Sequence, residues 1–133
     1  MEITYTCKRQ FSQKQLEELF LAVHWDSGKY PTRLYKALQN YETVITAWEG
    51  QNLAGLLGAI GDGGMTAYIH YVLVHPVYQG KGIGKKLVGL AKERYKDNLC
   101  VVLIAEHSGL IDFYEKEDFV HSQDSAAMYI KKM

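Results

Sequence analysis

The residues whose spacing could do chemistry lie in the stretch 74-VHPVYQGKGIGKKLV-88, where three glycines alternate with other residues. An apolar segment, 68-YIHYVLV-74, comes before them and an amphipathic run follows. Glycine reaches positive φ and lets a ligand approach the main chain, and a helix N-terminus attracts anions. A strand, a glycine loop and a helix therefore predict a site for a phosphate-bearing cofactor. A tight glycine-rich turn without a ligand explains the same pattern.

Two well-known phosphate loops are excluded by spacing. The dinucleotide fingerprint G-x-G-x-x-G would need glycine at position 85, which is Lys85. The P-loop needs four residues between its first glycine and the Gly-Lys pair, whereas three separate Gly80 from Gly84. Lys86 also stands where that motif has Ser or Thr.

The pattern that does match is Q-x-x-G-x-G at Gln79, Gly82 and Gly84, preceded by V-x-P at Val74 and Pro76. It resembles the coenzyme A loop of the GNAT superfamily of N-acetyltransferases. The later segment 110-LIDFYEKEDF-119 resembles the second signature of that superfamily, F-Y-E-K-x-G-F. The sequence departs from the pattern at two places, with Asp118 in place of glycine and His107 in place of an asparagine that contacts the cofactor. Asp tolerates the left-handed conformation better than most residues.

The resemblance implies a binding site for acetyl-CoA as co-substrate. The main chain of the strand before the loop would bind the pantetheine arm, and the loop N–H groups would hold the pyrophosphate. The implied cofactor-binding residues are Val72, Leu73, Val74, Gln79, Gly80, Lys81, Gly82, Ile83, Gly84, Lys85 and Tyr114. Lys81 and Lys85 could add positive charge to this site, or they could simply be solvated surface residues.

The resemblance implies that Tyr114 is the general acid that protonates the departing thiolate. A phenol with a reference pKa near 10 keeps its proton at neutral pH. A tyrosine packed on the core with its hydroxyl at the cofactor edge is the alternative. For the general base, two residues are candidates, His70 and Glu106, beside a relay through water. His70 has a suitable intrinsic pKa, although a strand histidine is often structural.

The acceptor would be a primary amine of a small molecule or peptide. The resemblance implies that the first two helices and their connector, 24-HWDSGKYP-31, select the acceptor. In this connector, Trp25, Asp26 and Tyr30 could receive a cation by cation–π and ionic contacts. The same aromatic residues could instead pack on the edge of the sheet.

Hydrophobic periodicity predicts the elements that must position these residues. A strand is expected at 2–7, and a helix at 11–23 that Ser12 and Gln15 begin with a capping box. A second helix is expected at about 32–40, followed by antiparallel strands at 43–48, 53–60 and 66–74. The helix at 82–95 connects to a buried strand at 99–105, which predicts a parallel pair. A helix at 108–117 and short strands near 119–122 and 125–131 complete the chain.

These elements predict one α/β domain over residues 1–133, with a mixed, mostly antiparallel sheet flanked by helices and a splayed parallel pair at its centre. Fifteen basic and fifteen acidic residues cancel, so charge does not favour nucleic acid or a membrane as partner. The five histidines lack ligand spacing, so no metal is expected. Cys7 and Cys100 are expected to be free, with Cys100 in the core. No signal peptide or membrane span is recognised, which favours the cytoplasm.

The sequence thus predicts an acetyl-CoA-dependent N-acetyltransferase, and the resemblance allows a homodimer, which is common in the superfamily. The first alternative is a non-catalytic acyl-CoA sensor or regulatory module on the same fold. The second is a nucleotide-phosphate binder that shares only the loop.

Overall fold

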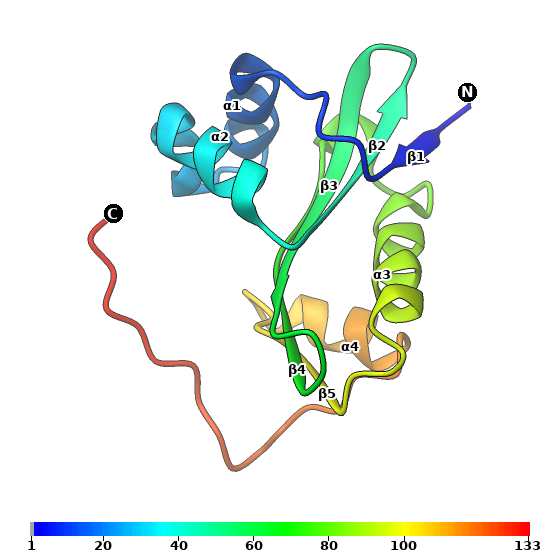
Figure 1. Cartoon of the computed structure of the whole chain (residues 1–133), viewed down its shortest axis with the longest axis vertical. Coiled ribbons are helices and arrows are strands. Elements are labelled where there is room, and N and C mark those ends of the chain that lie inside the picture. The colour runs from blue at the N-terminus through cyan, green and yellow to red at the C-terminus, as the bar shows by residue number, and fades with distance from the viewer. Residues whose placement is uncertain (1) are drawn as a thin grey trace.

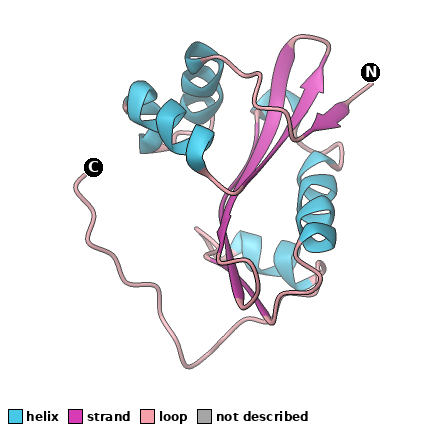
Figure 2. Cartoon of the chain, viewed as in Figure 1, coloured by secondary structure: helices cyan, strands magenta, loops and turns pink. Residues whose placement is uncertain are grey.

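The computed structural model describes residues 2–133 and contains one five-stranded sheet with helices on both faces (Figures 1 and 2). The strands lie in chain order: β1 (Thr4–Thr6), β2 (Thr43–Glu49), β3 (Asn52–Gly61), β4 (Thr66–Val74) and β5 (Cys100–Leu103). Strands β1 to β4 pair antiparallel, and β5 pairs parallel to β4. The helices are α1 (Gln13–Ala22), α2 (Pro31–Asn40), α3 (Ile83–Arg94) and α4 (Gly109–Glu115). The mixed α/β fold class is confirmed.

The start of α1 shows how local sequence sets the helix boundaries. The Ser12 hydroxyl accepts a hydrogen bond from the Gln15 N–H at 3.0 Å, and the Gln15 side-chain oxygen accepts one from the Ser12 N–H at 2.8 Å. This reciprocal pair is the capping box that the sequence predicts. Pro31 begins α2, where its missing N–H costs nothing.

The sheet separates two apolar cores. Helices α1 and α2 bury Leu16, Phe20 and Leu38 against one face, which also holds Leu56 and Leu73. On the other face, α3 and α4 contribute a second cluster with Ile45, Leu57 and Ile69 from the strands; its helix residues are Ile83, Leu87, Val88, Ala91 and Tyr114. Both faces of the sheet are therefore covered, so β4 is held by packing on each side and α3 by packing on one face.

Strand β4 contains a bulge at His70. Tyr71 is opposite Gly58 and Ile69 is opposite Ala59, so His70 is the extra residue. Side chains of a regular strand alternate between faces, but the bulge interrupts this alternation. Ile69 therefore packs in the α3 core, whereas Tyr71 packs in the α1–α2 core.

Four expectations about the last third of the chain were wrong. No strand forms at 119–122 or 125–131; this segment leaves α4 and runs as an extended tail that ends near α2 (Figure 1). The parallel pair consequently lies at the edge of the sheet, and β5 is not a buried strand, since Leu99 is 78% exposed and Val102 42%. Cys100 is likewise exposed rather than part of the core. An apolar run indicates a buried strand only when a further strand covers its outer edge.

Within residues 2–133, no helix is long and apolar enough to cross a membrane.

Candidate acyl-CoA and acceptor site

The glycine loop ends at the start of α3, and two of its glycines have positive φ. Gly82 is the N-cap of α3 with φ 80°, and Gly80 has φ 79°. No atom would meet a Cβ at either position, so glycine is needed there for backbone conformation rather than for space. The first bond of α3 joins the Lys86 N–H to the Gly82 carbonyl. The N–H groups of Ile83, Gly84 and Lys85 thus have no acceptor inside the helix, and such helix N-termini attract anions.

Side chains around the loop fix it to the sheet. The Gln79 amide donates to the Val74 carbonyl at 2.9 Å, so Gln79 closes the loop on the end of β4. The Tyr78 hydroxyl donates to Glu49 at 2.7 Å. Lys81 and Lys85 are exposed. The loop is therefore held in place by Gln79 and Tyr78, while its N–H groups stay open.

Beyond Ile69, no strand within residues 2–133 pairs with β4 on its β5 side. The parallel pairing ends at Ile69 opposite Leu103, whereas Val72, Leu73 and Val74 continue to pair with β3. Because the His75 N–H donates to the Ala54 carbonyl of β3, the main-chain groups of Val72 and Val74 face the other edge, where Gln79 already occupies the Val74 carbonyl. The Val72 groups and the Val74 N–H are thus available to a ligand just before the loop. An extended ligand with amide groups could bind along this edge as a strand would. Val72, Leu73 and Val74 are the three strand residues that the family resemblance assigns to the pantetheine arm.

Tyr114 lies in α4 and is 8% exposed. Its ring contacts those of Phe113 and Phe119, with centroids 5.0 and 5.8 Å away. Burial, and to a smaller extent the charge of Glu106, raises the pKa of Tyr114 to about 12. The phenol therefore keeps its proton at neutral pH. Asp118, with φ 75°, adopts the left-handed conformation expected where the superfamily has glycine.

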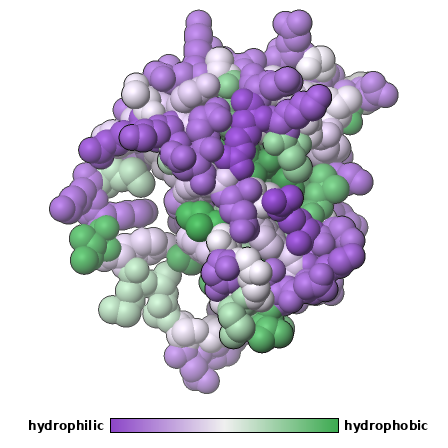
Figure 3. All heavy atoms as spheres, in the orientation of Figure 1, coloured by the Kyte–Doolittle hydropathy of each residue, from purple (hydrophilic) through white to green (hydrophobic). Residues whose placement is uncertain are grey.

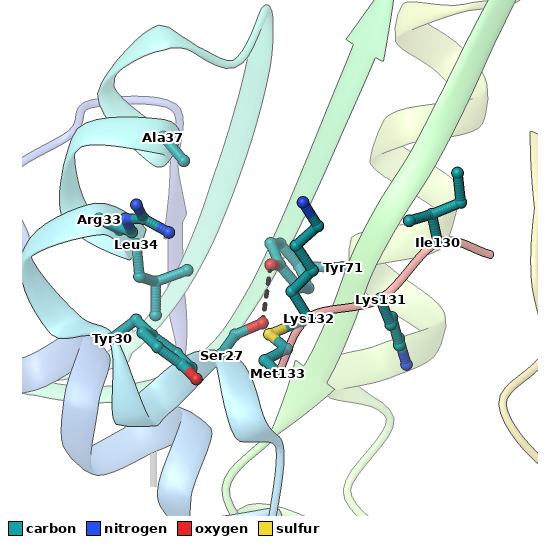
Figure 4. A pocket seen from close by; sticks show the side chains of 10 residues that line it. All are labelled: Ser27, Tyr30, Arg33, Leu34, Ala37, Tyr71, Ile130, Lys131, Lys132 and Met133. Carbon is teal, nitrogen blue, oxygen red and sulfur yellow. Dashed lines mark hydrogen bonds between the residues drawn. The ribbon is translucent and has the colours of Figure 1, made fainter.

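A cavity of about 220 Å³ brings together four of the residues that the sequence singles out. Trp25 and Asp26 reach it from the connector after α1, His70 from β4 and Glu106 from the segment after β5. Asp26 is exposed and paired with Lys29 at 3.0 Å. Tyr30 does not line this cavity. It lines a second one of about 370 Å³ beside Ser27, Arg33 and Tyr71 (Figure 4).

His70 stands in an aromatic cluster formed by Tyr41, Tyr68, His70 and Tyr71. Its ring stacks on Tyr71 with centroids 4.0 Å apart, and its Nδ1 is hydrogen-bonded to the Tyr41 hydroxyl. Although much of the side chain is open to solvent, partial desolvation lowers the pKa of His70. Glu106 raises this pKa and Lys131 lowers it, by smaller amounts. The imidazole is therefore neutral at neutral pH and able to accept a proton.

Sequence reasoning missed several residues of these cavities. Tyr41 follows α2 and reaches His70 from 29 positions away, and the Tyr71 hydroxyl shares a hydrogen bond of 3.0 Å with Ser27 (Figure 4). Tyr129 and Lys131, from the tail, line the smaller cavity. No spacing rule connects positions so far apart, and the only hint was the high count of ten tyrosines.

Among residues 2–133, no group of three or more His, Cys, Asp or Glu side chains is placed to hold a metal ion.

Comparison with known proteins identifies the family. Residues 9–119 match the model of the acetyltransferase (GNAT) family. An uncharacterized N-acetyltransferase ycf52-like protein of Prochlorococcus marinus is 36% identical over 109 residues, which cover 77% of this chain and 59% of that protein. An uncharacterized N-acetyltransferase ycf52 of Pyropia yezoensis is 26% identical, over 92% of this chain and 73% of that protein. The chain thus spans less than two thirds of the first of these relatives.

Solved structures share the fold. A probable acetyltransferase of unknown function from meticillin-resistant Staphylococcus aureus superposes with a TM-score of 0.89 and 25% identity, over 98% of this chain and all of that one. A GNAT family acetyltransferase from Streptococcus pneumoniae gives a TM-score of 0.84 and 24% identity, over 99% of this chain and all of that one. The open edge of β4, the glycine-capped helix and these matches lead to one conclusion: the chain belongs to the acetyltransferase (GNAT) family.

Proposed function

We propose that this chain transfers an acetyl group from acetyl-CoA to a primary amine. The observation that carries the proposal is the open edge of β4 leading directly into the N-terminus of α3. The amide groups of a pantetheine arm could bind along the open edge of β4. The negative charge of a pyrophosphate suits the N-terminus of α3. Val72, Leu73 and Val74 would hold the arm, and residues 79–85 would hold the pyrophosphate.

The reaction would be a direct attack on the thioester. The amine first loses a proton to a base, its nitrogen attacks the carbonyl carbon, and the C–S bond then breaks to release the thiolate. Tyr114 would supply the proton to sulfur. A thiol has a lower reference pKa than a phenol, near 8.5. Proton transfer from Tyr114 to sulfur therefore depends on a CoA thiolate that is shielded from water, because burial raises the pKa of the thiol.

His70 and Glu106 are the candidate bases, and they share one cavity with Trp25 and Asp26. The neutral imidazole of His70 favours it as the direct acceptor of the proton. The Trp25 ring and the Asp26 carboxylate would attract the ammonium form of the acceptor. A cavity of about 220 Å³ suits a small amine or the terminus of a peptide, and Tyr30 in the neighbouring cavity would contact a longer acceptor.

Two measurements test the proposal. Calorimetric titration with acetyl-CoA, CoA, ATP and NAD should show binding of the two CoA compounds. Release of free thiol from acetyl-CoA is then followed with polyamines, arylalkylamines, amino sugars, amino acids and peptides, and at least one class should raise it above the hydrolysis rate.

If the protein binds ATP but neither acetyl-CoA nor CoA, the proposal is overturned and the protein is a nucleotide binder. Binding of CoA without thiol release from any amine would favour an acyl-CoA sensor instead.

A further inference from the structure

The larger of the two cavities, of about 370 Å³, lies between α2 and the tail formed by residues 119–133 (Figure 4). Its charged side chains are all basic: Arg33 comes from α2, and Lys131 and Lys132 come from the tail. Among residues 2–133, no acidic side chain lines this cavity, and none of the three cations forms an ion pair. Like charges without a counter-charge repel one another, so an anionic ligand would relieve this repulsion.

Two neutral hydroxyl groups stand beside these cations. The Ser27 and Tyr71 hydroxyls share a hydrogen bond of 3.0 Å, and the two residues are 9% and 8% exposed. That bond uses one O–H group, so the pair has a second O–H group that can donate to a ligand. In Figure 4, Arg33 reaches in from α2 and Lys132 from the tail, with the Tyr71 hydroxyl between them. Guanidinium, ammonium and hydroxyl donors together form the kind of site that a carboxylate or a phosphate occupies.

The two cavities are neighbours that differ in charge. They share part of their walls, which is formed by Ser27, Tyr71, Lys131 and Met133. The smaller cavity is the one with acidic side chains, Asp26 and Glu106, and it also contains His70. Asp26 is paired with Lys29, whereas Glu106 forms no ion pair within residues 2–133. A cationic group is therefore favoured beside Glu106 and an anionic group beside Arg33.

The larger cavity also has an apolar wall. Leu34, Ala37 and Ile130 line it beside the cations. Such a surface suits methylene groups, which gain from burial against apolar side chains. Figure 3 shows open space between the tail and the body, so a ligand can reach this side of the molecule from solvent. A linear ligand with an ammonium group at one end and an anionic group at the other fits this arrangement.

We propose that the acceptor of this chain carries an anionic group, a carboxylate or a phosphate, in addition to its primary amine. The amine lies in the smaller cavity beside His70 and Glu106, and the anionic group lies in the larger cavity between Arg33 and Lys132. This inference rests on the acetyl transfer proposed above and narrows its class of acceptor. Diamines and polyamines are poor acceptors, because their second ammonium group would lie among the cations.

Binding to the protein without an acyl donor is the first test. Nuclear magnetic resonance titration compares ω-amino acids of increasing length, from β-alanine upward, with their neutral amides and with diamines of equal length. Phosphoethanolamine and ethanolamine form the pair that tests a phosphate. We expect at least one anionic compound to bind about tenfold more tightly than its neutral partner, because hydrogen bonds to charged groups are the stronger ones.

The preferred compound shows whether the anionic group is a carboxylate or a phosphate. Diamines should bind more weakly than the neutral partners. If no anionic compound binds more tightly than its neutral partner, or if diamines bind as tightly as the anionic compounds, the proposal is overturned.

Substitutions in the larger cavity locate the anionic group. Arg33→Met and Lys132→Met should each weaken binding of the preferred anionic compound by about three- to tenfold, since solvent partly screens these exposed charges. Binding of its neutral partner should not change. Lys36→Met is the matched control, because Lys36 is also an exposed cation of α2 but does not line the cavity. If both cavity variants keep the preference for the anionic compound, or if Lys36→Met loses it equally, the proposal is overturned.

Turnover separates this inference from the acetyl transfer on which it rests. Thiol release from acetyl-CoA is measured with the same anionic and neutral compounds, and kcat/KM should be higher for the anionic one in the native chain but not in Arg33→Met. If amines release thiol without this preference, the acceptor class is wrong and acetyl transfer stands. If the anionic compounds bind through Arg33 but no amine releases thiol, the anion site is supported and acetyl transfer is wrong.

Discussion

The candidate site has two halves that differ in what they present to a ligand. The loop side, formed by the end of β4 and residues 79–85, offers main-chain groups, and its conformation depends on Gly80 and Gly82. The aromatic side, formed by Trp25 and the cluster around His70, offers rings, a carboxylate and an imidazole. A site made of main-chain groups keeps its ligand through most side-chain substitutions other than those of its glycines. A site made of side chains can bind a different ligand when those side chains are substituted. In the proposed reaction, the loop side would hold the acyl donor and the aromatic side would hold the acceptor.

Tyr114→Phe should have the largest effect, because Tyr114 is the one side chain proposed to act on the departing sulfur. We expect kcat to fall by about 10² or more, with little change in the Kd for CoA. The phenyl ring preserves the contacts with Phe113 and Phe119, so the folded structure should persist. Steady-state thiol release and calorimetry measure the two quantities. An unchanged kcat would remove Tyr114 from the acid role.

Gly82→Val should mainly affect the loop side. A β-branched residue at φ 80° is strained by about 1–2 kcal/mol, so the Kd for acetyl-CoA should rise about tenfold. Gly89→Ala is the matched control, because Gly89 lies within α3 and an added Cβ there would meet open space. It should leave binding unchanged and stabilise the helix by up to about 1 kcal/mol. Equal binding by both variants would show that the left-handed N-cap is not required.

The pH profile tests the aromatic side. If His70 is the base, kcat/KM falls as pH decreases through its pKa, which desolvation holds below the reference value of 6.5. Glu106 raises this pKa, so Glu106→Gln should move the acidic limb to lower pH; Lys131→Met should move it to higher pH. Shifts of less than one unit are expected, in opposite directions. A limb that both variants leave in place, or that disappears in Glu106→Gln, would exclude His70 as the base.

The smallest effect is expected from the loop lysines. Lys81 is exposed, so its charge is screened by salt. Lys81→Ala should weaken CoA binding by about two- to threefold at low ionic strength and less at high salt. A loss of CoA affinity of tenfold or more that does not depend on salt would mean that the Lys81 side chain, and not only the main chain, binds CoA at the loop side.

The same contrast explains what the sequence could predict. The capping box of Ser12 and Gln15, the left-handed Asp118 and the helix after Gly82 follow from residues a few positions apart, and all were predicted. The aromatic side depends on contacts such as that between Tyr41 and His70, which no periodicity encodes. The tail has the composition of a strand, but strand formation needs a partner, and composition does not say where the partner is. Cys100 was wrongly predicted to lie in the core, because the strand expected to cover β5 does not form.

The bulge at His70 has a consequence for how this gene can change. Ile69 and Tyr71 already occupy successive positions opposite β3, so losing the codon for His70 would leave the alternation of both halves of β4 intact. Losing a codon elsewhere in the strand, such as that of Leu73, would move the side chains beyond it to the opposite faces of the sheet. The extra codon places the rings of His70 and Tyr71 face to face, which two neighbours in a regular strand cannot achieve. Descendants of this sequence should therefore vary in the length of β4 only at this point, and each such loss should remove one ring from the cavity of about 220 Å³ that His70 lines.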